Sequence, residues 1–175
     1  MEQTSSTVYW ATFEHENWKF HLGATDHGLC TILFSDETYE NLERWVKKSI
    51  PGAILKADET KLLPYIDEIR DYLCGRLQVF SSPLDLRGTP FQVQVWRALQ
   101  QIPYGQTRSY SEIAANVGRK NAVRAVGAAN GANPLPIMIP CHRVIGKNGT
   151  LTGYSGGLDI KVKLLTLEGQ SQWAL

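Results

Sequence analysis

One short run of this sequence, IPCHRV at residues 139–144, holds the residue types needed for nucleophilic chemistry. A cysteine thiolate is a strong nucleophile, and a nearby base or positive charge raises the fraction of thiolate present near neutral pH. His142 offers the base, Arg143 offers the charge, and Pro140 stiffens the chain that leads to Cys141. The alternative is that Cys141 is a small buried apolar residue beside unrelated neighbours, as free cysteines often are.

The length, cysteine content and apolar stretches of the chain limit the class of protein to which it can belong. Its 175 residues are enough for one large domain or two small ones with their own hydrophobic cores. Its three cysteines include no CxxC pair, which argues against a disulfide framework or a zinc ribbon. No apolar stretch reaches membrane-spanning length, and the polar start of the chain is unlike a signal peptide. We therefore expect a cytoplasmic protein with no membrane partner.

Charge is divided unevenly between the two halves. Residues 1–87 hold nine basic and 14 acidic residues, a net charge of −5, whereas residues 88–175 hold nine basic and three acidic residues, a net charge of +6. Such an excess of positive charge favours contact between the second half and a polyanion. Mutual attraction between the two halves is the alternative.

The first half predicts a small α+β scaffold. Runs of β-branched and aromatic residues separated by turns predict an antiparallel meander over Thr7–Phe13, Trp18–Ala24 and Leu29–Phe34. Asp36 is expected to cap the following helix, and a second helix is expected from about Leu62 to Cys74. Because proline lacks an N–H, Pro64 must lie in the first turn of that helix or delay its start. We expect a scaffold domain over residues 1–80, a linker over 81–88 and a second domain over 89–175.

The elements that must position Cys141 lie in the second half. Thr89 and Pro90 are expected to open a helix, as its cap and first residue. Two short helices follow, at about 109–118 and 121–129, and the tight turn at Gly118 between them predicts a helix-turn-helix. The second of them carries Arg124 among alanines and a glycine, which favours reading of DNA shape and backbone over base edges. A small-residue helix packed inside the protein is the alternative.

Taken together, these residues resemble those of the O6-alkylguanine-DNA alkyltransferases, also called methylated-DNA–protein-cysteine methyltransferases. The resemblance is dense over residues 88–170 and holds only in outline before them. Its motifs are TPF at 89–91, IPYG at 102–105, RAVG at 124–127, NP at 133–134, IPCHRV at 139–144 and GYSGG at 153–157. One departure is Lys163, where many members carry an aromatic residue, and we expect it to change local packing only. The presence of Cys141 separates the chain from the related proteins that lack the acceptor cysteine and only bind lesions.

The resemblance implies an in-line displacement at the alkyl carbon on guanine O6, in which Cys141 attacks as thiolate and guanine leaves. His142 would be the base, acting through a bridging water because adjacent residues in an extended chain point apart. Glu168 would orient His142 in the manner of a hydrolase triad. Asn133 would hold the turn around the site, and Tyr110 would hydrogen-bond the flipped base.

The resemblance also implies a DNA surface and a substrate pocket. Extruding a base costs a few kcal/mol, and an alkylated guanine that pairs poorly lowers that cost. Arg124 would occupy the place that the base leaves in the duplex. The other expected DNA contacts are Ser109, Ala125, Gly127, Ala128 and Asn130. The expected pocket residues are Met138, Tyr154, Ser155, Gly156 and Lys161, among which Ser155 and the backbone of the glycine-rich loop would stabilise charge on O6.

The implied partner is double-stranded DNA that contains alkylated guanine, and the implied protein is a monomer without a cofactor. Because S-alkylcysteine is a stable thioether, we expect a stoichiometric acceptor that repairs one lesion. Some family members bind a structural zinc in the first half, but Cys30 and Cys74 are isolated here, so we expect no metal. The expected fold class is α+β, with a small N-terminal antiparallel sheet plus helices and then a mostly helical, winged-helix-like C-terminal domain.

Two other classes of protein remain open. A cysteine hydrolase would use the same cysteine, histidine and acid, but it leaves the basic helix pair unexplained. A winged-helix transcription regulator explains the helices and the charge, but not Cys141 with His142 and Glu168. The sequence also leaves open the preferred alkyl size and whether O4-alkylthymine is a substrate.

Overall fold

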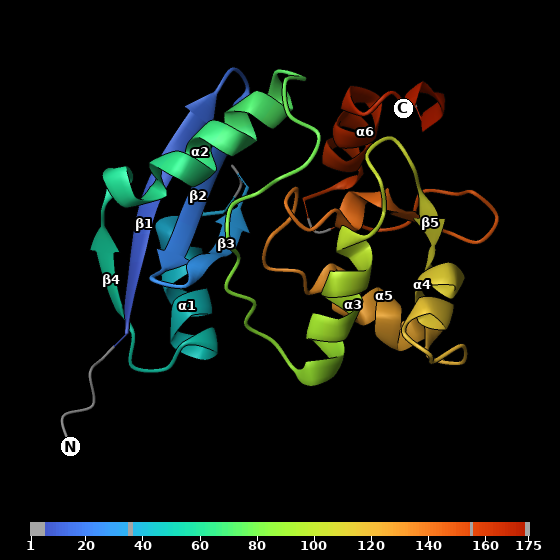
Figure 1. The fold of residues 1–175 in the computed structure, drawn as a ribbon, viewed down its shortest axis with the longest axis horizontal. Helices are drawn as coiled ribbons and strands as arrows, with labels where there is room; N and C mark the ends of the chain where they lie inside the picture. The colour runs from blue at the N-terminus through green and yellow to red at the C-terminus, as the bar shows by residue number, and fades with distance from the viewer. Residues whose placement is uncertain (1–5, 35–36, 155, 174–175) are drawn as a thin grey trace. The chain divides into compact units, whose positions relative to one another are not determined.

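The computed structural model describes residues 6–34, 37–154 and 156–173. The chain forms two compact units, Met1–Arg87 and Gly88–Leu175 (Figure 1). The first unit combines a four-stranded sheet with two helices, and the second is mostly helical, which confirms the expected α+β class. Within the described ranges, no helix is both long and apolar enough to span a lipid bilayer.

The sheet of the first unit has the strand order β3-β2-β1-β4. The antiparallel meander of β1 (Thr7–His15), β2 (Trp18–Thr25) and β3 (Gly28–Leu33) confirms the three predicted strands. The sequence did not predict β4 (Ile54–Ala57), which adds an edge strand to this meander by pairing with β1 in parallel. This edge strand has only four residues, most of them exposed, and therefore carries no hydrophobic alternation that could reveal it.

Two helices accompany this sheet. The first, α1 (Tyr39–Ser49), is capped by Thr38, whose hydroxyl accepts a hydrogen bond from the Asn41 backbone N–H, and not by Asp36, which lies outside the described residues. The second, α2 (Glu59–Leu73), begins earlier than predicted because Asp58 caps it. Pro64 consequently lies in the second turn of α2, which corrects its expected place in the first turn.

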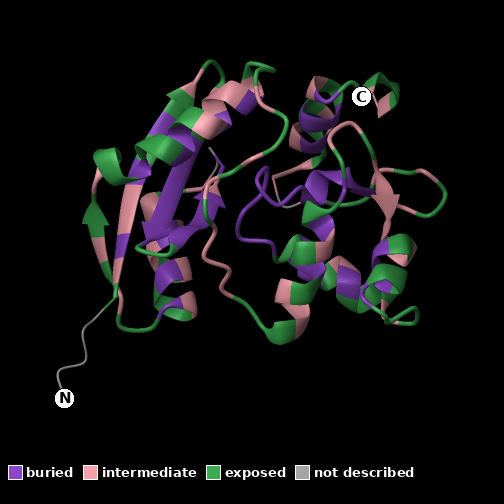
Figure 2. Ribbon diagram, in the orientation of Figure 1, coloured by how far each residue is buried: buried purple, intermediate pink, exposed green. Residues whose placement is uncertain are grey.

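The core of the first unit consists mainly of apolar side chains from the sheet and its helices. Phe20, Leu22 and Ile32 of the sheet and Leu42 of α1 are at most 2% exposed, and Figure 2 shows β2 and β3 buried over most of their length. Residues 83–85, expected inside the linker, pack on this unit: the Leu29 N–H donates to the Pro83 carbonyl at 3.0 Å, and the Asp85 N–H donates to the Leu29 carbonyl at 2.8 Å. Gly28 permits this approach, because a Cβ there would lie 2.5 Å from the Pro83 oxygen.

The second unit is built on α3 (Pro90–Gln100), which Thr89 caps as predicted, with Gln92 completing a capping box. Trp96 of this helix is 1% exposed and donates its indole N–H to the Ala129 carbonyl at 2.8 Å. That bond fixes α3 against α5 (Val123–Gly131). The other helix of the predicted pair is α4 (Tyr110–Asn116), capped by Ser109.

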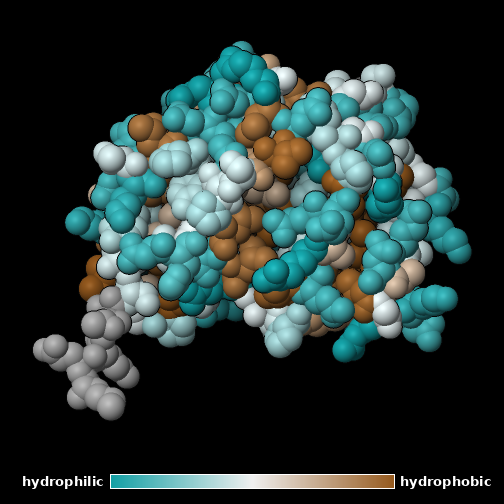
Figure 3. Space-filling view, viewed as in Figure 1, coloured by the Kyte–Doolittle hydropathy of each residue, from teal (hydrophilic) through white to brown (hydrophobic). Residues whose placement is uncertain are grey.

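Two short strands and a terminal helix complete this unit. The strands β5 (Arg108–Ser109) and β6 (Val144–Ile145) pair in parallel. Immediately before β6, the 3-10 turn η1 (Cys141–Arg143) carries the candidate nucleophile. The helix α6 (Leu158–Leu167) ends at Glu168, and a second 3-10 turn, η2 (Ser171–Trp173), follows. Hydrophilic side chains are spread over the face of this unit that is visible in Figure 3.

Candidate active site

The Glu168 carboxylate is the centre of a buried hydrogen-bond network. Glu168 is 5% exposed, and its Oε2 atom lies 2.7 Å from His142 Nε2. Arg143 donates to both carboxylate oxygens, from Nε at 2.7 Å and from the terminal NH2 at 2.9 Å. Burial alone would raise the pKa of Glu168, but the hydrogen bonds from His142 and Arg143 outweigh it and lower that pKa. Glu168 is therefore ionised at neutral pH.

This network fixes the protonation state of His142. A carboxylate only accepts hydrogen bonds, so His142 Nε2 carries the proton and Nδ1 keeps its lone pair. The His142 side chain is fully buried, and burial lowers its pKa despite the neighbouring carboxylate. Nδ1 has no hydrogen-bond partner in the described part of the chain. The imidazole is thus a neutral base whose free nitrogen can accept a proton.

Cys141 is 2% exposed. Burial raises the pKa of its thiol, whereas the side chains of Asn133 and Tyr154 and the positive charge of Lys161 act in the opposite direction. The thiol therefore remains protonated near neutral pH and needs a base to become a nucleophile. His142, the next residue in the chain, is the candidate for this base.

The positive charge that favours the Cys141 thiolate is that of Lys161, not that of Arg143 as the sequence suggested. The Arg143 guanidinium is fully engaged by Glu168 and by the Ile102 carbonyl, to which its NH1 donates at 2.7 Å. Lys161 is completely buried and donates to the carbonyls of Val144 at 2.6 Å and Thr152 at 3.2 Å. Burial lowers the pKa of Lys161 to about 8, although the Cys141 thiolate would raise it. The sequence could have indicated the Arg143 ion pair, because only three acids are available in the second half.

Asn133 holds the buried segment that leads to the cysteine, as the sequence suggested. Its side-chain NH2 donates to the Ile139 carbonyl at 2.9 Å, and its side-chain oxygen accepts from the Leu135 N–H at 2.9 Å. Residues 133–144 are all buried (Figure 2). Within them, Ile137 adopts a φ of 76°, a left-handed conformation that is strained for a β-branched side chain. No sequence signal indicated this backbone conformation.

The Ile137 backbone gives a prediction about stability. In an ordinary buried segment, glycine is less stable than alanine by roughly 0.5–1 kcal/mol. At the left-handed Ile137, this order should reverse, because glycine has no Cβ to strain. We expect Ile137→Gly to exceed Ile137→Ala by about 1 kcal/mol in the free energy of unfolding, measured by urea denaturation. The usual order, with alanine the more stable, would show that residue 137 is unstrained.

The expected base-binding residues lie around Tyr110 and the 152–157 loop. The Tyr110 hydroxyl accepts a hydrogen bond from Thr152 Oγ1 at 2.9 Å, a partner that the sequence did not suggest. Lys161 holds the same loop through the Thr152 carbonyl. Tyr154 and Gly156 are partly exposed and Met138 is buried, whereas Ser155 lies outside the described residues.

The α5 helix presents the expected DNA contacts unequally. Arg124, Ala125 and Ala128 are exposed, Gly127 and Ser109 are partly exposed, and Asn130 is only 5% exposed. A methyl group on Gly127 would lie 3.9 Å from Tyr110 Cδ1, so the small-residue surface of α5 adjoins Tyr110. The small residues of α5 and the Tyr110 side chain are therefore neighbours.

Among its described residues, the first unit offers no comparable centre. Cys30 is buried and donates its thiol to the Gly23 carbonyl, while Cys74 is exposed and lies 3.6 Å from His15 Nε2. Burial raises the pKa of Cys30 to about 12, which makes it inert. Where the chain is described, no group of three or more histidine, cysteine or acidic side chains is placed to hold a metal ion.

Both units match known domain families. Residues 90–170 match the family described as "6-O-methylguanine DNA methyltransferase, DNA binding domain", and residues 8–86 match "6-O-methylguanine DNA methyltransferase, ribonuclease-like domain". The chain therefore belongs to the 6-O-methylguanine DNA methyltransferase family.

Similarity to individual members extends over nearly the whole chain. The inducible methylated-DNA–protein-cysteine methyltransferase of Bacillus subtilis is 49% identical over 96% of this chain and 94% of the relative. The constitutive protein of the same organism is 57% identical over 91% of this chain and 94% of its own. The crystal structure of the Mycobacterium tuberculosis O6-methylguanine methyltransferase is 40% identical, with a TM-score of 0.80 over 96% of this chain and 95% of that one.

Proposed function

We propose that this chain repairs DNA by transferring the alkyl group of O6-alkylguanine irreversibly to Cys141. The observation that carries the proposal is the buried Cys141 followed by a neutral histidine, which an ionised Glu168 orients. The named relatives, which are methylated-DNA–protein-cysteine methyltransferases, support the same reaction. Because no step regenerates the thiol from a thioether, each molecule acts once.

In the proposed reaction, His142 Nδ1 accepts the thiol proton, through a bridging water, and the sulfur attacks the alkyl carbon. The carbon–oxygen bond breaks, and its electron pair leaves on guanine O6. Tyr110 and the amides of the 152–157 loop stabilise that charge as hydrogen-bond donors. Lys161 holds the loop and favours the thiolate, while Glu168 stabilises the imidazolium that forms.

The proposed substrate is double-stranded DNA, from which the damaged base is flipped. The exposed Arg124 occupies the vacated place in the duplex, and the exposed alanines of α5 allow close approach to the groove. A structure of the Mycobacterium tuberculosis relative "in complex with DNA", with a TM-score of 0.78, supports DNA as the partner. We further propose a monomer in the reducing cytoplasm, where Cys141 stays a free thiol.

The decisive experiment is intact-mass analysis after exposure to duplexes that contain O6-methylguanine, with ethyl and benzyl lesions compared in parallel. We expect the protein to gain one methyl group, and peptide mapping to place it on Cys141 and not on Cys30 or Cys74. A mass that does not change would contradict the transferase and favour a hydrolase or a regulator. The comparison of alkyl groups would also establish the size that the pocket accepts.

The rate of transfer should depend on pH in a defined direction. The pKa of the Cys141 thiol is raised, so raising the pH from 6 to 9 should increase the fraction of thiolate and the rate. Burial lowers the pKa of His142 below its ordinary value of 6.5, so protonation of this base should not reverse the increase. Single-turnover rates with free O6-benzylguanine, which needs no DNA binding, would test this. A rate that falls with rising pH would contradict the claim that the Cys141 thiol is protonated before the reaction.

Replacing Glu168 by glutamine should impair both chemistry and stability. His142 loses the charged side chain that orients it. Because acid–base assistance accelerates a reaction by about 10²–10⁴-fold, we expect transfer to slow by roughly ten- to a thousandfold. The buried Arg143 also loses its counter-charge, which should reduce the free energy of unfolding by about 3–5 kcal/mol. The matched control is Asp159→Asn, which changes an exposed acid of the same unit. Rates should be measured at a temperature where circular dichroism shows the variant to be folded, and an unchanged rate would remove Glu168 from the mechanism.

A further inference from the structure

The IPYG run at residues 102–105 forms a tight turn between α3 and β5, the IPYG turn, to which the reaction proposed above assigns no role. The Gln106 N–H donates to the Pro103 carbonyl at 3.1 Å, which closes a β-turn. Gly105, the third residue of this β-turn, has a φ of 77°, a left-handed conformation that favours glycine. A Cβ at Gly105 would also lie 3.1 Å from the backbone oxygen of Glu168. The IPYG turn therefore lies directly against the segment that carries Glu168.

Hydrogen bonds tie the IPYG turn to the end of α6. The Tyr104 hydroxyl donates to the Leu167 carbonyl at 3.2 Å. The Gly105 N–H donates to Glu168 Oε1 at 3.4 Å, and the side-chain NH2 of Gln170 donates to the Gly105 carbonyl. These contacts fall on Glu168 itself and on residues just before and after it. The turn consequently fixes the position of the Glu168 carboxylate.

The same turn holds the arginine that pairs with Glu168. The Ile102 carbonyl accepts a hydrogen bond from Arg143 NH1 at 2.7 Å. The centroid of the Tyr104 ring lies 5.7 Å from the guanidinium carbon of Arg143, a distance at which a cation and an aromatic face attract each other. Burial raises the pKa of Tyr104, so its phenol stays neutral beside this ion pair. The turn thus contacts both partners of the buried ion pair.

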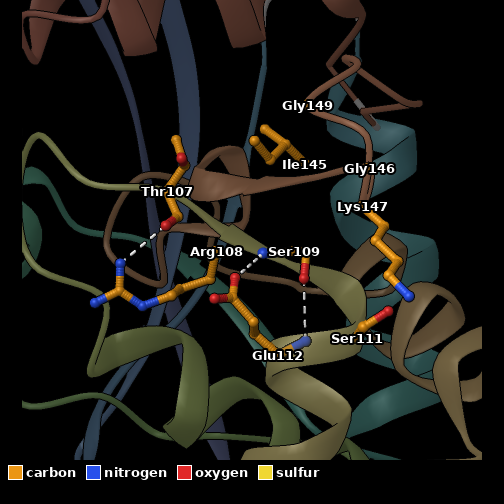
Figure 4. Close-up of a pocket in the computed structure, with 9 residues that line it drawn as sticks. All are labelled: Thr107, Arg108, Ser109, Ser111, Glu112, Ile145, Gly146, Lys147 and Gly149. Atoms are coloured by element: carbon orange, nitrogen blue, oxygen red, sulfur yellow. Dashed lines mark hydrogen bonds between the residues drawn. The ribbon is translucent and has the colours of Figure 1, made fainter.

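The far end of the IPYG turn is braced by Arg108. The Arg108 guanidinium donates to the Thr107 carbonyl and to Gln106 Oε1, both at 2.9 Å, and Figure 4 shows the first of these bonds. Arg108 opens β5 and pairs in register with Val144, the residue that directly follows Arg143. The turn and the η1 segment are therefore also joined through the β5–β6 pair.

Opposing charges act on the buried His142 ring. Burial is the main cause of its lowered pKa, and the positive charges of Arg143 and Lys161 lower this pKa further, whereas Glu168 acts in the opposite direction. Without Arg143 beside it, the Glu168 carboxylate would act on the imidazole uncompensated and would favour its protonated form. A protonated imidazole has no lone pair with which to accept the proton of the Cys141 thiol. The placement of Arg143 therefore matters for the base.

We infer that Tyr104 of the IPYG turn positions the Arg143 guanidinium so that His142 remains a neutral base. Tyr104 is thus a positioning residue for alkyl transfer, and it acts through Arg143. The inference rests on the proposed function and adds to it a residue that controls the pH range of the reaction. The ring of Tyr104 contacts Arg143, whereas its hydroxyl contacts the end of α6, so substitutions can remove the two contacts separately.

The test compares Tyr104→Leu with Tyr104→Phe in single-turnover transfer from free O6-benzylguanine between pH 6 and 9. Because Tyr104→Leu lacks the ring, we expect its rate to fall about tenfold at pH 6 and by less than about twofold at pH 9. Tyr104→Phe keeps the ring and should follow the pH profile of the unaltered protein. A tenfold change corresponds to about 1.4 kcal/mol, which is within the range of a cation–π contact shielded from water.

The His142 ring provides a second readout that does not depend on transfer. NMR titration of isotope-labelled protein follows its ring nitrogens, and comparison with His142→Gln assigns their signals. The midpoint of this titration should lie at higher pH in Tyr104→Leu and should be unchanged in Tyr104→Phe. Phe91→Leu is the matched control, because the Phe91 ring centroid lies 5.4 Å from the guanidinium carbon of Arg119 in the same unit. This control should change neither measurement.

A further variant keeps the test decisive if Tyr104→Leu does not fold. Pentafluorophenylalanine at position 104 retains nearly the shape of phenylalanine but lacks its negative face, so its rate at pH 6 should also fall. A loss of equal size at every pH, or an unchanged His142 titration in a folded variant without the ring, would overturn the inference. Absence of any transfer by the unaltered protein would instead contradict the proposed function, so the two failures are distinguishable.

Discussion

Replacing Cys141 by serine is expected to abolish alkyl transfer while DNA binding survives. A serine hydroxyl near its ordinary pKa is a far weaker nucleophile than a thiolate, so it should not displace guanine from the alkyl carbon. The exchange of sulfur for oxygen is nearly isosteric, so the buried surroundings of residue 141 should be retained. The expected loss is complete within the sensitivity of a radiolabelled-methyl assay.

The other two cysteines provide the matched controls for this variant. Cys30→Ala and Cys74→Ala should both transfer at the rate of the unaltered protein, since neither lies in the second unit. An electrophoretic mobility assay should show Cys141→Ser bound to a methylated duplex with nearly unchanged affinity. Any burst of methyl transfer to Cys141→Ser would remove Cys141 as the acceptor.

Arg124→Ala is expected to reduce repair of duplex DNA much more than reaction with a free alkylguanine base. Arg124 is exposed on α5 and is assigned to stabilising the extruded state, which the free base does not need. Flipping costs a few kcal/mol, so loss of this support should slow the duplex reaction by about 10- to 1000-fold. The exposed neighbours Ala125 and Ala128 are too small to take over the role.

The measurement is the ratio of single-turnover rates on a methylated duplex and on free O6-benzylguanine. Arg97→Ala, which removes an exposed arginine of α3 in the same unit, should leave that ratio unchanged. Binding of the Arg124 variant should still weaken with salt and vary little with flanking sequence, because phosphate contacts remain. Equal losses on both substrates would show that Arg124 supports the fold of the active site instead.

Local signals in the sequence were sufficient to predict the helix ends at which they lie. Thr89 and Pro90 marked the start of α3, and Ser109 and Gly118 bounded the next helix, because capping chemistry is a property of a few adjacent residues. The family resemblance placed Cys141, His142 and Glu168 together before any geometry was known. The structure brings the last two within 2.7 Å.

Features that depend on distant partners could not be predicted in this way. The strand β4 forms because it pairs with β1, and its four residues carry little hydrophobic pattern that could reveal a strand. The ion pair of Arg143 with Glu168 joins residues far apart in the chain, so the sequence suggested the wrong partner for that arginine. The packed segment around Ile137 imposes its left-handed backbone conformation, which the intrinsic preference of isoleucine opposes.

The 2% exposure of Cys141 also bears on how the protein survives until it meets a lesion. A protein that can react only once is wasted whenever its sulfur is oxidised or captured by a stray electrophile. Peroxides and general thiol reagents attack accessible thiolates, and the Cys141 thiol is both enclosed and protonated at rest. The exposed Cys74 is the thiol that such reagents meet first. Burial therefore protects the Cys141 thiol from oxidation until a damaged base reaches it.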